Sequence, residues 1–508
     1  MKNNRKYLNI IFIILVTIGI LVRIWGFPNA IQEMNCDEIM TVINAKSIVE
    51  TGKEINGISF PVYLQGWGGQ SVMLLYLMAL SFKIFDYSLF AVRLPILVVS
   101  IISLFVFYDF VKKVTKNQKI ALIGLAILAI CPWHILQSIW ALDCNMFPHF
   151  LLIAMDLLYT GIIKNNKKII YISMLFYAIT LYCYGVAIYF VPLFLLVFCI
   201  YLLKNKTINY KDAIICIVIF LLFATPIILM FAINFLHIDT QIKIFNITIP
   251  YYSSLSRTQD MLFFTDNKVS QLFKNIISTI TVIFRQEDGA EWNSSEIFGT
   301  TYHITIIFTL IYIASMIKRR KNMKEFSAEN FLMLAWLSIS ILTGFIINEA
   351  NINRLNSIWY ILLLLAANGI YLIYEKIKYK KIYVTIIICI YTILFAIYTI
   401  YFYSYYSEVV SNSGCFSEGY YQALSYVKAT DKKHVIYDNT KDDGNMKLYT
   451  DFNRNEDKTY TVVMNEEELK DKIENLAEDE VVIVYTKFKD YYTEFNTYKI
   501  GNYKIIYR

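Results

Sequence analysis

Long apolar runs separated by short polar turns fill most of the first 403 residues. They lie at 7–25, 89–111, 119–135, 146–163, 169–183, 185–203, 212–235, 301–317, 330–347, 355–374 and 382–403. A helix needs about 20 apolar residues to cross the hydrocarbon core of a bilayer, and shorter runs can tilt or borrow flanking residues. The pattern therefore predicts an all-α polytopic membrane domain over residues 1–403, with about 11 transmembrane helices.

Basic residues between the runs indicate the topology. Lysine and arginine collect at 112–116, 164–168, 204–211, 318–321 and 376–381. All five clusters lie in the cytoplasm if the N-terminus starts there and the short run Val72–Phe85 does not cross. We therefore predict that Val72–Phe85 is an amphipathic helix on the outer interface. No small-x-small site follows the first run, so we expect it to remain an uncleaved span.

Three polar parts then face the outside of the cell membrane. They are the loop 26–88, the long loop 236–300 and the tail 404–508. The tail alternates β-branched, apolar-rich segments with a helical stretch, Glu466–Leu476. The predicted strands are His434–Tyr437, Tyr460–Met464, Val481–Tyr485 and Tyr503–Tyr507. The tail is thus predicted to be a small extracytoplasmic α/β domain.

The composition supports a membrane protein and argues against nucleic-acid binding. The chain is 57% hydrophobic and 17% charged, whereas soluble domains are about 45–50% apolar and about 25% charged. Its net charge of +7 comes from short clusters between spans and not from one basic surface. No cysteine spacing indicates zinc or a disulfide framework. Cys36 and Cys144 each adjoin an acid, so they are either neighbours in space or two free thiols.

An acid pair follows the first span, in Asn35-Cys36-Asp37-Glu38. The segment Glu38–Thr51 has helical spacing, so Asp37 could simply cap the helix and complement its dipole. The alternative is that the two carboxylates carry chemistry at the membrane surface.

A glycine- and aromatic-rich stretch at 57–70 favours the chemical alternative. Its glycines let the backbone approach a ligand, and Tyr63 and Trp67 offer flat faces on which sugars stack. The stretch ends at Gln70 and leads into the predicted interfacial helix. Together with Asp37 and Glu38, it predicts a pocket.

Two further acids have open interpretations. Asp143 lies in the second outer turn, where it is either solvated or part of the same site. Asp156 lies within an apolar run, where an acid is costly unless it faces a cavity or a partner. It is either a structural contact or a helper to the site.

Several arginines on the predicted outer side break the positive-inside pattern. Arg93 and Arg354 could contact lipid headgroups. They could also clamp an anionic substrate, because the guanidinium fork suits phosphate. Arg257 and Arg285, in the long outer loop, are weaker candidates of the same kind.

The order of these features resembles the GT-C glycosyltransferases. The acid pair, the glycine-aromatic stretch, the interfacial helix and Phe90-Ala91-Val92-Arg93-Leu94-Pro95 follow one another as in that class. The similarity is to bacterial relatives of protein O-mannosyltransferases and of the lipid A aminoarabinose transferase. It covers about the first 160 residues, and the later spans share only the layout. The resemblance implies a polyprenyl-phosphate-sugar donor and transfer on the outer face to a hydroxyl of a protein, glycan polymer or lipid.

The resemblance also implies roles for individual residues. Asp37 matches the catalytic acidic residue and Glu38 its companion. Asp143 matches a second outward acid, and the segment of Arg354 resembles a basic loop that binds lipid phosphate. The sequence departs from the pattern where a basic residue often precedes the interfacial helix, because this chain has Gln65 or Gln70 there.

We therefore predict an inverting sugar transfer with Asp37 as general base. The sequence requires no cofactor, although a divalent metal between Asp37 and Asp143 is compatible with it. The alternative is a transporter or lipid flippase whose acids and arginines line a pathway, a class that tends to show repeated halves with broken spans. A non-catalytic scaffold would leave the acid pair and Arg354 unexplained.

Overall fold

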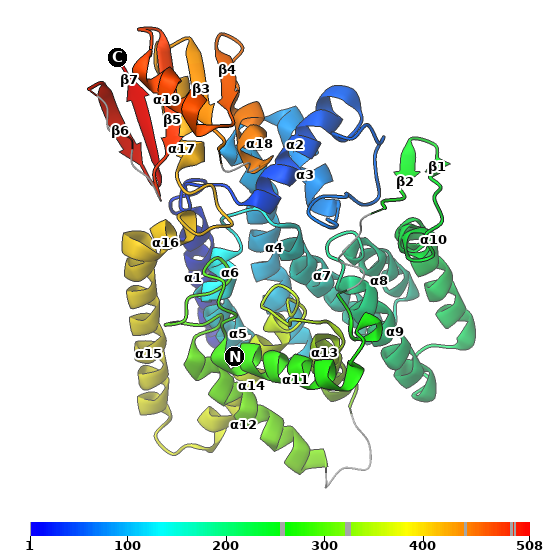
Figure 1. Ribbon diagram of the computed structural model, residues 1–508. Helices are drawn as coiled ribbons and strands as arrows, with labels where there is room; N and C mark the ends of the chain where they lie inside the picture. Colours follow the sequence, from blue (N-terminus) through cyan, green and yellow to red (C-terminus); the bar gives the residue numbers. More distant parts are fainter. Residues whose placement is uncertain (1, 254–259, 321–326, 441–443, 488–490, 492–493) are drawn as a thin grey trace.

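A computed structural model describes residues 2–253, 260–320, 327–440, 444–487, 491 and 494–508. Most of the chain forms a helical bundle, with a small sheet domain at one end (Figure 1). The bundle helices are α1 (Lys2–Ile24), α4 (Leu89–Thr115), α5 (Gln118–Ala129), α6 (Pro132–Leu136), α7 (Asp143–Ile163), α8 (Lys167–Thr180), α9 (Ala187–Lys204), α10 (Tyr210–Phe235), α12 (His303–Arg320), α13 (Ala328–Ile346), α14 (Trp359–Lys376) and α15 (Lys380–Tyr401).

Every predicted apolar run forms a helix, and the run 119–135 is divided between α5 and α6. Within the described residues, seven helices are long and apolar enough to cross a membrane by length and composition. They are α1, α4, α7, α9, α10, α13 and α15, whereas the apolar helices at 73–84, 118–129 and 303–318 are shorter. The chain is a mostly helical, multi-pass membrane protein as predicted, but a total of about 11 crossings is not confirmed.

Helix α14 forms the centre of the bundle. Every side chain from Trp359 to Ile370 is buried, as expected for a helix that is apolar all round. It packs on α5 and α12. Gly369 permits the contact with α12, since a Cβ atom at this position would lie 2.0 Å from the backbone oxygen of Phe308.

The two long loops carry secondary structure of their own. The first contains α2 (Cys36–Thr51) and α3 (Met73–Ile84), and α3 packs between α2 and α4. The second contains a hairpin of β1 (Ile242–Ile244) and β2 (Ile247–Ile249), the 3-10 turn η1 (Leu262–Phe264) and α11 (Lys268–Arg285). The predicted helix at Val72–Phe85 is thus present as α3, while its position at a membrane interface stays a prediction.

The C-terminal part forms a mixed five-stranded sheet with order β4-β3-β5-β7-β6. Its elements are η2 (Phe402–Tyr406), α16 (Ser407–Ser411), α17 (Tyr420–Lys428), β3 (His434–Asp438), α18 (Gly444–Asn453), β4 (Thr459–Val463), α19 (Glu466–Glu474), β5 (Glu480–Tyr485), β6 (Asn496–Ile500) and β7 (Tyr503–Tyr507). Strands β4, β3 and β5 run parallel, and β7 runs antiparallel to both β5 and β6. The four predicted strands are confirmed. The edge strand β6 was not predicted, and its side chains are mostly exposed.

We expect Gly369→Ala to destabilise the bundle by about 1–3 kcal/mol, because the added methyl group forces α12 and α14 apart. Thermal unfolding of the detergent-solubilised protein measures the effect. Gly444→Ala is the matched control, since a Cβ atom there meets nothing within 4 Å. Equal melting temperatures for the two variants would contradict the packing argument.

Candidate active site

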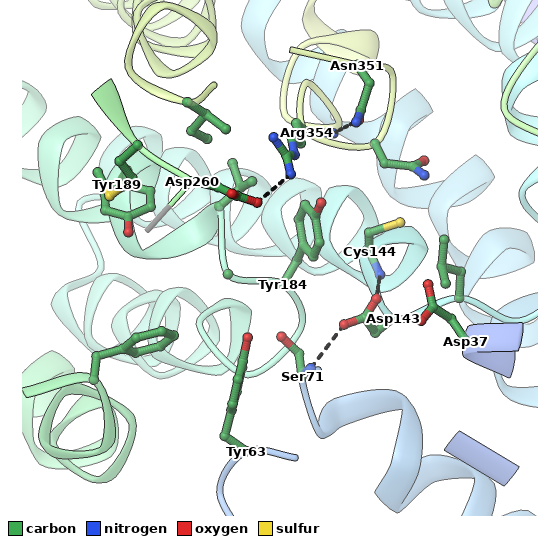
Figure 2. Close-up of a pocket in the computed structure, with 17 residues that line it drawn as sticks. Asp37, Tyr63, Ser71, Asp143, Cys144, Tyr184, Tyr189, Asp260, Asn351 and Arg354 are labelled. Carbon is green, nitrogen blue, oxygen red and sulfur yellow. Dashed lines mark hydrogen bonds and ion pairs between the residues drawn. The ribbon is translucent and has the colours of Figure 1, made fainter. Parts of the chain in front are cut away.

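A cavity of about 220 Å³ brings together residues that are far apart in the sequence. Asp37 from α2, Asp143 from the start of α7 and Arg354 from the segment before α14 all line it, together with Asp260 (Figure 2). Aromatic side chains cover part of the wall: Tyr63, Tyr184, Tyr189 and Phe231. Three residues that the sequence singled out separately, Asp37, Asp143 and Arg354, thus line one hollow.

Asp37 is presented to the cavity by the first turn of α2. Asn35 is the N-cap, and its side chain accepts a hydrogen bond of 2.9 Å from the backbone N–H of Asp37. The carboxylate of Glu38 completes the capping box by accepting from the N–H of Asn35 at 3.3 Å. The capping role considered for Asp37 therefore belongs to its neighbours. The half-buried carboxylate of Asp37 lines the cavity near the positive end of the helix dipole.

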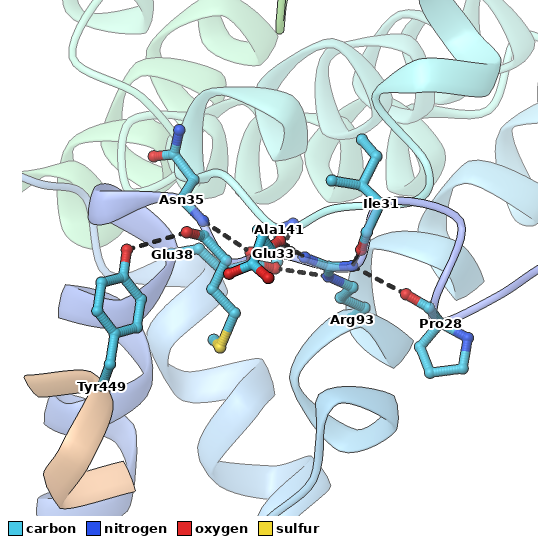
Figure 3. A network of polar contacts seen from close by, with 9 residues as sticks. Pro28, Ile31, Glu33, Asn35, Glu38, Arg93, Ala141 and Tyr449 are labelled. Carbon is cyan, nitrogen blue, oxygen red and sulfur yellow. Dashed lines mark hydrogen bonds and ion pairs between the residues drawn. The ribbon is translucent and has the colours of Figure 1, made fainter. Parts of the chain in front are cut away.

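Glu38 and Arg93 form an ion pair in the interior, and both side chains are 0% exposed (Figure 3). Nε and Nη2 of Arg93 each donate to a carboxylate oxygen of Glu38 at 2.9 Å. Arg93 also donates to the backbone carbonyls of Pro28, Ile31 and Glu33. The sequence suggested Arg93 as a clamp for an anionic substrate, but its guanidinium is fully engaged here and does not line the cavity.

The same carboxylate connects two of the cavity-lining segments. The backbone N–H of Ala141 donates to Oε1 of Glu38 at 3.0 Å. Ala141 lies two residues before Asp143, and Glu38 follows Asp37 directly. Glu38, held by Arg93, therefore fixes the position of Asp37 relative to Asp143.

The end of the glycine-aromatic stretch contacts both acidic segments. Nε2 of Gln70 donates to the backbone oxygen of Asp37 at 3.1 Å and to Oγ1 of Thr41 at 2.7 Å. The next residue, Ser71, donates its backbone N–H to Oδ2 of Asp143 at 3.0 Å. Gln70 is buried and absent from the cavity lining, so its observed contacts are those of a positioning residue.

Asp143 is the first residue of α7 and is almost fully buried. Its Oδ1 accepts the backbone N–H of Cys144 at 2.7 Å, and its Oδ2 accepts that of Ser71 (Figure 2). The interpretation of Asp143 as a solvated turn residue does not fit this burial. Both carboxylate oxygens are held in place by backbone donors.

The two aromatic residues suggested for sugar stacking lie in different surroundings. Tyr63 lines the cavity, and its ring centroid lies 5.4 Å from that of Phe231. Trp67 is 47% exposed and is absent from the cavity lining.

Of the other suggested residues, Arg257 lies outside the described residues. Arg285 is absent from the cavity lining and pairs with Glu287 at 3.5 Å.

Arg354 forms an ion pair that the sequence did not reveal. Its Nη2 lies 2.9 Å from Oδ2 of Asp260, and the two side chains are 20% and 48% exposed. Arg354 also donates to the backbone oxygen of Asn348, while its own N–H donates to Oδ1 of Asn351 at 2.8 Å. Asp260 was missed because a single acid in a long loop carries no pattern that distinguishes it.

Asp156, the acid within an apolar run, lies outside the cavity. It pairs with Lys113 of α4 at 2.8 Å, and Lys113 also donates to Thr160. This geometry supports the structural interpretation.

Among the described residues, no three or more His, Cys, Asp or Glu side chains are grouped so that they could hold a metal ion. The predicted compatibility with a divalent metal stays a prediction.

The helical bundle has the fold of the GT-C glycosyltransferases, the class that the sequence resembles. Residues 69–230 match the family model described as dolichyl-phosphate-mannose-protein mannosyltransferase. The chain is similar to ArnT from Cupriavidus metallidurans in the apo state, with 9% identity, a TM-score of 0.54 and 97% of each chain covered. The same protein bound to undecaprenyl phosphate gives 8% identity, a TM-score of 0.55 and the same coverage.

An archaeal relative of the fold is larger than this chain. The oligosaccharyltransferase AglB from Archaeoglobus fulgidus, in complex with an inhibitory peptide and a dolichol-phosphate, gives 12% identity and a TM-score of 0.51. The match covers 85% of this chain and 62% of that chain. No curated protein sequence matches the chain. The structural matches establish a shared fold. At identities this low, they do not identify the substrates of this chain.

We expect Glu38→Gln to lower the unfolding free energy by about 3–5 kcal/mol, because it leaves the charge of Arg93 buried without a counter-ion. Thermal unfolding in detergent measures the loss. Asp451→Asn is the control, since its ion pair with Lys447 is exposed and contributes little. A Glu38→Gln protein as stable as wild type would show that the pair does not hold the site together.

Proposed function

We propose that this protein is a membrane glycosyltransferase that moves a sugar from a polyprenyl-phosphate donor to an acceptor hydroxyl on the outer face of the cell membrane. The observation that carries the proposal is the cavity in which Asp37 and Asp143 face Arg354. Two matched structures contain dolichol-phosphate or undecaprenyl phosphate, which supports a lipid-phosphate donor for this chain as well.

Arg354 is the proposed contact for the donor phosphate. Its ion pair with Asp260 is partly exposed, and pairs of this kind contribute only about 0–1 kcal/mol. A phosphate can therefore compete with Asp260 for the guanidinium, which binds phosphate oxygens in a bidentate manner. As the bond to the sugar breaks, Arg354 stabilises the negative charge that grows on the leaving phosphate.

Asp37 is the proposed general base. The acceptor oxygen attacks the anomeric carbon, its proton passes to the Asp37 carboxylate, and the bond from that carbon to the phosphate oxygen breaks. Attack opposite the leaving group inverts the anomeric centre, and polyprenyl phosphate is released. General base catalysis contributes about 10²–10⁴-fold. Glu38 is not available for this step, because both of its oxygens already accept hydrogen bonds in the interior.

Asp143 and the aromatic wall are proposed to orient the sugar. A carboxylate held by two backbone N–H groups is a fixed acceptor for sugar or acceptor hydroxyls. The ring of Tyr63 lines the same cavity. The acceptor class, whether protein, glycan polymer or lipid, depends on surfaces beyond this cavity. The matches above are to glycosyltransferases, and no observation favours the transporter alternative.

We expect Asp37→Asn to reduce transfer at least about 10²-fold without loss of folded protein, because the amide cannot accept the proton. The assay follows release of polyprenyl phosphate from a labelled polyprenyl-phosphate sugar in membranes that contain the acceptor. Asp86→Asn, at an exposed acid of the same loop, is the matched control. Near-normal transfer by Asp37→Asn would remove Asp37 from the role of base.

Arg354 and Asp260 should respond in opposite directions. Arg354→Ala is expected to raise the donor KM and lower kcat by about 10-fold or more, because both bound phosphate and developing charge lose a partner. Asp260→Asn is expected to lower the donor KM, since it removes the carboxylate that competes with phosphate. Arg285→Ala serves as the control. If Asp260→Asn lost activity as Arg354→Ala does, Asp260 would have a direct role in the chemistry.

A further inference from the structure

The segment before Asp37 pairs with the start of the C-terminal domain. The backbone N–H of Cys36 donates to the oxygen of Cys415 at 2.8 Å, and the N–H of Ser417 donates to the oxygen of Met34 at 3.1 Å. Between these two bonds, Asn35 and Phe416 form an antiparallel bridge. The register of this isolated bridge places Cys36 opposite Cys415.

Other contacts hold the same junction together. The carboxylate of Glu33 accepts hydrogen bonds from the hydroxyl of Ser417 and from the backbone N–H groups of Tyr421 and Gln422, at the start of α17. Tyr449 of α18 donates its hydroxyl to the backbone oxygen of Met34 at 2.9 Å (Figure 3). The register that places the two cysteines together is thus fixed from both sides.

The geometry of the pair suits a disulfide. Directly opposed residues of an antiparallel pair have Cα atoms about 4.5–5.5 Å apart, and disulfides span about 4.4–6.8 Å between Cα atoms. The neighbouring Cys36 side chain also lowers the pKa of the Cys415 thiol below its ordinary value. A lower pKa increases the thiolate fraction that attacks a disulfide oxidant.

An oxidant can reach both sulfur atoms. Cys36 and Cys415 are each partly exposed, and both line a second cavity of about 260 Å³ between α2 and the sheet domain. Cys144 was the partner considered for Cys36 from the sequence, but it is buried and lines the first cavity. The backbone pairing places Cys415 beside Cys36 instead.

We propose that Cys36 and Cys415 form a disulfide that covalently joins the C-terminal domain to the helix that carries Asp37. The inference rests on the proposed outward placement of this face, because disulfides persist in oxidising compartments. In the first step the Cys415 thiolate attacks a small-molecule or protein disulfide and releases one thiol. The Cys36 thiolate then attacks the mixed disulfide and releases the second thiol. The pair loses two electrons and two protons, and the oxidant is reduced to two thiols.

The link would act on the first turn of α2. Cys36 is the first residue of that helix, and Asp37 is the second. With both cysteines reduced, the junction depends on hydrogen bonds, which can open and close. With the disulfide formed, the start of α2 cannot separate from residues 415–417, and the position of Asp37 is restrained.

Peptide mapping tests the proposal. The full-length protein in membranes is equilibrated with oxidised glutathione, alkylated, digested without reductant and analysed by mass spectrometry. We expect a linked peptide containing Cys36 and Cys415 that disappears on treatment with dithiothreitol. In Cys415→Ser, the Cys36 thiol should be alkylated. Cys389→Ser, at an exposed position on α15, should leave the linked peptide unchanged.

Three outcomes would overturn the proposal. They are complete alkylation of both cysteines after oxidation, a stable glutathione adduct on either one, or a link from Cys36 to Cys144. The melting temperature gives a second readout. It should fall by several degrees when the oxidised wild type is reduced, and it should not respond in Cys36→Ser or Cys415→Ser. A reduced wild type that melts at the same temperature would show that the link does not restrain the domain.

The mapping does not depend on sugar transfer. A linked peptide in a protein without transferase activity would contradict the proposed function and leave the disulfide intact. An active protein without the linked peptide would contradict only the disulfide.

Discussion

The buried pair of Glu38 and Arg93 is the interaction on which the site depends. Two opposite charges removed from water are tolerated only when each is paired and hydrogen-bonded, since an unpaired charge in the interior costs several kcal/mol. Here the carboxylate accepts from the guanidinium and from two backbone N–H groups, and the guanidinium also donates to three carbonyls. The carboxylate and the guanidinium can both be satisfied in only one arrangement of three elements: the start of α2, the segment before α7 and helix α4.

That arrangement assigns different tasks to the two adjacent acids. Glu38 turns inward and pairs with Arg93, while Asp37 lines the cavity. Gln70 and Ser71 add a second set of contacts to the same two segments. The two acidic segments are therefore held in place largely by backbone hydrogen bonds, whose donors and acceptors are fixed by the fold.

The sequence predicted the helices well, because long apolar runs have one stable form in a bilayer. It also singled out Asp37, Asp143 and Arg354, which line one cavity. It could not foresee that Glu38 would turn inward to pair with Arg93 while Asp37 lines the cavity, since the directions of two adjacent side chains are unknown until the helix is placed. The pairing of Asp260 with Arg354 spans about 90 positions of the chain. The pairing of Cys36 with Cys415 spans about 380 positions. No local pattern records contacts of that range.

The charges of the first cavity bear on how the protein distinguishes its donor from the surrounding bilayer. Three carboxylates and a single guanidinium are the charged groups among its lining residues. Phospholipid headgroups also carry phosphate, and they greatly outnumber any glycosylated carrier lipid. A wall with excess negative charge repels anionic headgroups in general. Under the proposed function, a headgroup that offers sugar hydroxyls to those carboxylates gains contacts that offset the repulsion. The side chains proposed to orient the sugar would then also discriminate against bulk lipid.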